Sequence, residues 1–174
     1  MMDHAYKAHS LPENYEVKLP VRVGLIIGFM GSLSIMVVVA GILILNGRDV
    51  FTAARLIATV VYGPDAAVGV APILIGTLAH LATGAAFGAV FARLMPALPR
   101  GIMIVAALVY ALGVWLISSF IILPIIAPPM IAADANKSIL LLAHAVYGLV
   151  LGAAGGTYRL LWRLPGWLQL PNLQ

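Results

Sequence analysis

Cysteine is absent from this chain of 174 residues, and charged residues make up only 9% of it. Without cysteine the chain has no disulfide, thiolate metal ligand, iron–sulfur cluster or c-type haem attachment, so its four histidines are the only strong ligands for a borderline metal. Hydrophobic residues make up 63% of the chain, against roughly 45–50% in an ordinary soluble domain. This composition excludes a soluble enzyme and predicts a membrane protein.

Charged residues are also missing from four long apolar runs. Each run has about 20 residues, which is enough for a helix to cross the hydrocarbon of a bilayer. A helix is expected because it satisfies its own backbone hydrogen bonds in lipid. The fold class is therefore an all-α integral membrane protein with four transmembrane helices. The predicted parts are a polar N-terminal tail (1–22), a transmembrane domain (23–163) with helices at 23–45, 73–92, 102–123 and 139–157, and a C-terminal tail (164–174).

The basic residues predict the orientation in the membrane. Arg48, Arg55 and Lys137 fall on one side of the predicted spans, and the other seven of the ten basic residues fall on the opposite side. Positive charge marks the cytoplasmic side. Both termini are therefore expected in the cytoplasm of a bacterium, with the protein in the inner membrane.

The connections on the outer side differ from each other. Asn46-Gly47 ends the first span, Asp49 is a good N-cap, and Gly63-Pro64 follows, so 50–62 is predicted to form a short helix. We expect this helix to lie flat in the outer interface, with Arg55 facing water or a lipid phosphate, or else to be re-entrant. The second connection, 124–137, contains three prolines and is expected to be irregular without helix through them.

An internal repeat relates the second span to the fourth. Each contains Leu-Ala-His followed by two glycines at steps of four residues. Residues four apart share one ridge of a helix, and a glycine ridge lets two helices approach closely in lipid. The sequence therefore predicts two repeated helical hairpins, with His80 and His144 at similar depth and near each other if the glycine faces meet. The packing glycines are Gly84, Gly88, Gly148 and Gly152.

Part of the chain resembles small four-helix bacterial inner-membrane proteins of uncharacterised function, the YagU-like group. The resemblance rests on Gly47 to Phe51, on Ala54 to Ala58, on Gly63-Pro64 and on His80 with its glycines. It covers residues 47–95 and, through the repeat, 138–159. It implies a bacterial inner-membrane location and carries no established activity. The long polar N-terminal tail departs from the group.

The histidine pair is the one constellation within the spans that is suited to chemistry. Two neutral imidazoles at matched depth can hold haem b, with glycines making room for the macrocycle, and one can bind the magnesium of a (bacterio)chlorophyll or contact a quinone. A hydrogen bond across a helix interface is the commoner role of such a residue, so no cofactor is the leading expectation. His4 and His9 in the tail have a spacing that a solvated segment explains, and no metal site is predicted.

The prediction of function rests on which motifs and residue types the chain contains and which it lacks. No catalytic or nucleic-acid motif is present, and the spans lack the carboxylates that ion pathways usually need. Tyr110, Trp115 and the pair Ser118-Ser119 either line a ligand groove or pack within the bundle. The leading hypothesis is a non-catalytic subunit of a larger respiratory or photosynthetic membrane complex, with other membrane subunits and lipids as partners. The alternative is a small b-type cytochrome or pigment-binding protein that uses His80 and His144, and a small-molecule transporter is a minor one.

Overall fold

The computed structural model describes residues 19–63, 68–95, 98–126 and 137–162, and these parts of the chain are helical with short connections. The predictions for the two tails mostly lie outside the described residues, as do His4 and His9. The elements in chain order are α1 (Val21–Leu45), α2 (Thr52–Tyr62), α3 (Val70–Leu94), α4 (Arg100–Ile117), a π-helical turn η1 (Ser118–Ile122), α5 (Leu123–Ile126) and α7 (Lys137–Trp162).

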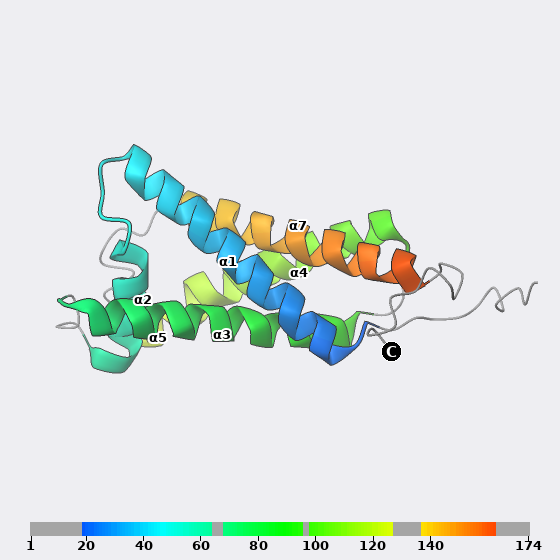
Figure 1. The fold of residues 1–174 in the computed structure, drawn as a ribbon, viewed down its shortest axis with the longest axis horizontal. Coiled ribbons are helices and arrows are strands. Elements are labelled where there is room, and N and C mark those ends of the chain that lie inside the picture. The colour runs from blue at the N-terminus through cyan, green and yellow to red at the C-terminus, as the bar shows by residue number, and fades with distance from the viewer. Residues whose placement is uncertain (1–18, 64–67, 96–97, 127–136, 163–174) are drawn as a thin grey trace, which may run out of the picture.

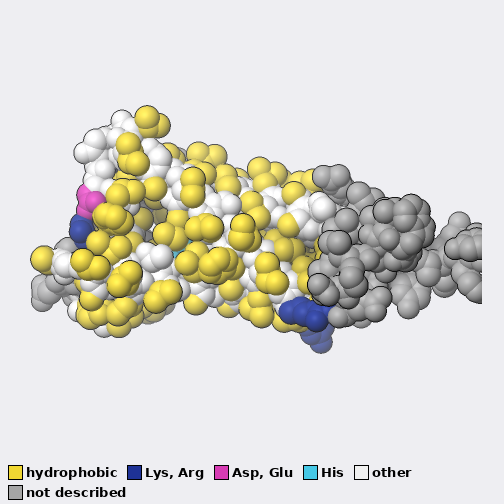
Figure 2. Space-filling model, in the orientation of Figure 1, with side chains coloured by type: hydrophobic (Ala, Val, Ile, Leu, Met, Phe, Trp, Pro, Cys, Tyr) yellow, Lys and Arg dark blue, Asp and Glu magenta, His cyan; other side chains and the backbone are white. Residues whose placement is uncertain are grey.

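Four of the helical segments are long and apolar enough to cross a membrane, which confirms the predicted number of spans. Each is somewhat longer than its predicted run: Val21–Leu45, Val70–Leu94, Gly101–Ile126 and Lys137–Tyr158. Figure 2 shows hydrophobic side chains over the middle of the bundle, with charged side chains of the described residues gathered toward its two ends. This distribution fits a multi-pass helical membrane protein.

The first span ends and α2 begins much as the sequence predicts. Gly47 has a φ of 66° and Gly63 a φ of 75°, a region that favours glycine, and they follow α1 and α2 respectively. The short helix begins at Thr52 instead of residue 50, because Asp49 organises a turn before the helix instead of occupying its N-cap position.

Helix α1 occupies a central place in the bundle because it packs against both α3 and α7 (Figure 1). Helix α7 packs in turn against α4, and α2 runs across one end of α3 (Figure 1). The core between the long helices includes Ile27, Phe91, Met103, Tyr147 and Leu151. Most other large apolar side chains lie on the outside of the bundle, where lipid or another membrane protein would cover them.

The third span is not a uniform α-helix, and the prediction that no helix runs through Pro124 is wrong. Helix α5 includes Pro124, and the π-helical turn η1 precedes it. In this turn the Leu123 N–H donates to the Ser118 carbonyl, five residues back. Proline removes an N–H and its ring crowds the carbonyl four residues earlier. A wider turn just before Pro124 relieves this crowding, so the helix continues to Ile126.

The start of α1 and the end of α7 lie at the same end of the bundle. A Cβ atom placed on Gly155 of α7 would lie 3.8 Å from Leu19, which directly precedes α1. The opposite end carries α2 and the connection from α1 (Figure 1). The start and the finish of the described chain therefore lie at one end of the bundle, and α2 lies at the other.

Candidate functional site

The glycines of α3 pack against the glycines of α1. A Cβ atom on Gly88 would lie only 2.2 Å from the Gly24 carbonyl oxygen, and one on Gly28 would lie 2.3 Å from that of Gly84. Real side chains do not approach this closely, so the two helices are in backbone contact here. Gly84 also accommodates Ser32, which is buried.

The equivalent glycines of α7 face a different helix. Gly148 lies against Ala107 and Ala111 of α4, and Gly152 lies against Ile104. The glycine faces of the second and fourth spans, whose meeting was the condition for the two histidines to be neighbours, therefore do not meet. The reason is that each glycine ridge is already filled by the small residues of a neighbouring helix.

Two tyrosines connect helices across the interior, and sequence reasoning missed their role. The Tyr147 hydroxyl of α7 donates to the Gly84 carbonyl of α3 at 2.6 Å, while its ring covers Gly31 of α1. The Tyr110 hydroxyl of α4 donates to the Phe87 carbonyl of α3 at 2.8 Å. A tyrosine in hydrocarbon needs a partner for its hydroxyl. The sequence signal that could have indicated these contacts was the presence of both tyrosines within apolar runs.

His80 of α3 and His144 of α7 lie at corresponding places on two helices that are in contact. The Tyr147 hydroxyl of α7 bonds to the Gly84 carbonyl of α3, and each histidine lies about one turn before its helix's partner in this bond. The Nε2 atom of His80 is buried and has no hydrogen-bond partner among the described residues. The two predicted histidines therefore lie on neighbouring helices even though their glycine ridges face apart.

His144 has one ring nitrogen engaged within its own helix. Its Nδ1 atom lies 2.8 Å from the Leu140 carbonyl oxygen. A carbonyl only accepts, so in the neutral ring Nδ1 carries the proton and Nε2 keeps a lone pair. His144 can therefore serve another group as a hydrogen-bond acceptor.

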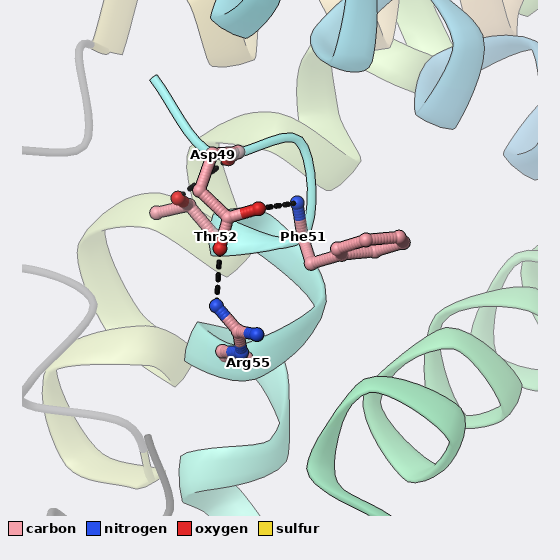
Figure 3. Close-up of polar contacts among 4 residues, drawn as sticks. All are labelled: Asp49, Phe51, Thr52 and Arg55. Atoms are coloured by element: carbon pink, nitrogen blue, oxygen red, sulfur yellow. Dashed lines mark hydrogen bonds and ion pairs between the residues drawn. The ribbon is translucent and has the colours of Figure 1, made fainter. Parts of the chain in front are cut away.

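Arg55 of α2 is paired with Asp49 in the turn before the helix (Figure 3). Asp49 also accepts from the Phe51 N–H at 3.1 Å, and its carbonyl accepts from the Thr52 hydroxyl at 2.7 Å. The guanidinium is thus engaged by a carboxylate of its own segment. Binding of a lipid phosphate by Arg55 stays a prediction.

The end of α4 and the following turn η1 carry further polar atoms without partners. The Ser119 hydroxyl and the Trp115 indole N–H are buried and make no hydrogen bond to the described residues. Trp115 packs edge-on against Phe120 at 5.6 Å between ring centroids, and Lys137 lies 4.7 Å above the Phe120 ring. These contacts tie the end of the third span to the start of the fourth.

The described residues contain no group of three or more His, Asp or Glu side chains that is suited to hold a metal ion. Four long apolar helices in these residues are the mark of a multi-pass helical membrane protein. The chain belongs to DUF6789, a family of unknown function, whose model matches residues 19–161. No curated protein and no solved structure matches the chain.

Proposed function

We propose that the protein is a non-catalytic subunit of a larger membrane complex. The proposal rests on one observation: the protein's own helices fill the glycine ridges by packing against each other. The rows at Gly84 and Gly148 are filled by α1 and α4, so they do not line a substrate path. The outer surface of the spans is apolar, and the described extramembrane surface consists of helix ends and short connections. A protein built in this way acts mainly through what its outer faces contact.

The kind of complex that we favour carries out respiratory or photosynthetic electron transport in the bacterial inner membrane. Support comes from the compact four-span architecture, in which the described residues provide no domain outside the membrane. The resemblance to YagU-like proteins points to the same membrane. Both termini are assigned to the cytoplasm on the sequence, in which seven of the ten basic residues fall before or at the start of α1, beside the connection from α3 to α4, or at and after the end of α7.

The internal repeat and the interfacial helix belong to the same proposal. The pairs α1 with α3 and α4 with α7 are each antiparallel neighbours joined through small residues, as two copies of one hairpin would be. Helix α2 runs across the end of α3 (Figure 1), an orientation that suits a position in the outer interface. Its buried side is made by Ala54, Ala58 and Thr59.

A b-type cytochrome or pigment-binding protein is the second candidate, because His80 and His144 lie at corresponding places on two helices that are in contact. The glycines expected to make room for a macrocycle instead contact α1 and α4. We therefore place this candidate second. An absorption spectrum of the purified protein tests it: a Soret band that disappears in His80→Ala would favour haem over the packing role.

The subunit proposal is tested by purification at native expression level in a mild detergent. The tagged chain is expected to migrate on a native gel far above its 18.3 kDa, together with redox subunits identified by mass spectrometry. Deleting residues 2–18 is expected to weaken this association, and the full-length tagged chain serves as the control. Migration of the tagged protein alone, or only with copies of itself, would contradict the proposal.

A further inference from the structure

The unpartnered Nε2 atom of His80 is the starting point. It is buried within the bundle, and no described residue forms a hydrogen bond with it. Burying a polar atom costs free energy unless another group satisfies it. Lipid surrounds the span, so bulk water does not reach this nitrogen freely to form the missing hydrogen bond. A polar group from outside the described residues is therefore expected at this atom.

The neighbouring ring restricts what that group can be. Because Nδ1 of His144 donates to the Leu140 carbonyl, its Nε2 atom can only accept a hydrogen bond while the ring is neutral. A group that meets this nitrogen must therefore carry a donor. An O–H group fits, whereas a bare carbonyl, which only accepts, does not.

The charge around the two rings restricts the ligand further. Within α3 the single charged residue is Arg93, near the end of the helix that is opposite to α2. The described segment of α7 carries its charged residues, Lys137 and Arg159, toward its two ends. A charged ligand between the rings would lie in a medium of low dielectric without a counter-ion. The ligand is therefore neutral and soluble in the membrane.

We propose that His80 and His144 together bind the hydroxyl-bearing head group of a neutral amphiphile. The chemistry matches the reduced, hydroquinone form of a membrane quinone, whose hydroxyl group can donate to Nε2 of His144 and offers a polar partner to Nε2 of His80. A long-chain lipid alcohol offers the same donor. The proposal concerns binding alone and involves no electron transfer. It does not depend on the role as a subunit, which is tested separately by co-purification.

The experiment uses the full chain in phosphatidylcholine nanodiscs that contain no quinone. Decylubiquinol, its oxidised form decylubiquinone, and farnesol are titrated separately, and binding is followed by tryptophan fluorescence. The reduced form is expected to bind about tenfold more tightly than the oxidised form, which corresponds to one hydrogen bond. Tight binding of decylubiquinol alone assigns a hydroquinone. Equal binding of farnesol assigns a lipid alcohol to the same site.

Variants locate the site. His80→Phe and His144→Phe keep a ring but remove the nitrogens, so each is expected to weaken decylubiquinol binding about tenfold. Thr83→Ala is the matched control, because Thr83 is an exposed polar residue three positions beyond His80 on α3. Equal affinities for decylubiquinol and decylubiquinone, or unchanged affinity in both phenylalanine variants, would overturn the proposal.

A second measurement does not depend on the folding of variants. In wild-type protein labelled with ¹⁵N-histidine, addition of decylubiquinol is expected to shift the Nε2 resonances of two rings. Unchanged histidine spectra with saturating decylubiquinol and farnesol would show that neither hydroxyl source occupies the site, and the proposal would fail.

Discussion

The hydroxyl of Tyr147 in α7 donates a hydrogen bond of 2.6 Å to the backbone carbonyl of Gly84 in α3. The tyrosine is only 3% exposed, and its ring covers Gly31 of α1. One side chain of α7 therefore contacts both α1 and α3. Gly84 serves this bond and at the same time accommodates Ser32. The packing of α7 on these two helices thus includes a polar contact in addition to apolar ones.

Removing this hydroxyl is expected to weaken the bundle without changing its shape. Tyr147→Phe keeps the ring over Gly31 but loses the bond, at a cost of about 0.5–1.5 kcal/mol in the free energy of unfolding. Unfolding in mixed detergent micelles, followed by circular dichroism, measures this change. Tyr62→Phe on the exposed side of α2 is the control and should be neutral. Equal stability of Tyr147→Phe and the wild type would show that the bond contributes nothing.

Glycine is required where α1 meets α3 and is not required everywhere in the spans. Gly28→Ala would place a methyl group 2.3 Å from the Gly84 carbonyl oxygen, so the helices must separate and stability should fall by about 1–3 kcal/mol. Gly113→Ala in α4 is the matched control, because no atom lies within 4 Å of the added methyl. It should be neutral or slightly stabilising, since alanine favours the helix. Thermal unfolding in detergent compares the two, and a loss as large in Gly113→Ala would contradict this reading.

The turn before α2 depends more on the Asp49 side-chain acceptor than on its charge. Asp49→Asn retains an oxygen for the Phe51 N–H and loses the ion pair with Arg55, whereas Asp49→Ala loses both. Partly exposed ion pairs contribute about 0–1 kcal/mol. We therefore expect the alanine variant to increase amide hydrogen exchange at the start of α2 clearly more than the asparagine variant does. The opposite order would indicate that the ion pair holds the turn.

The absence of native cysteine makes the orientation directly testable. Single cysteines at Asn46 and Asn136 are expected to react with an impermeant maleimide added outside spheroplasts, because both positions belong to the side with few basic residues. A cysteine at Gln174 should react only after the membrane is made permeable. The reverse pattern would place both termini outside.

Much of the fold is determined by the sequence through local physics. Four uncharged apolar runs form helices because a helix satisfies its own backbone hydrogen bonds in lipid, and Gly47 and Gly63 mark helix ends through their positive φ. The short helix after the first span follows from the same local signals. The histidines were identifiable because a titratable residue in an apolar run is rare.

Only the tertiary structure decided which surfaces meet. A glycine ridge predicts close packing but does not name its partner, since any helix with small residues fits it. Hence Gly84 faces α1 and Gly148 faces α4, although their sequences repeat. The π-helical turn before Pro124 also escaped prediction, because it depends on how one ring is accommodated within the third span. His80 and His144 come to lie at corresponding places on neighbouring helices because Tyr147 of α7 bonds to Gly84 of α3, a relation between distant segments that no local pattern contains.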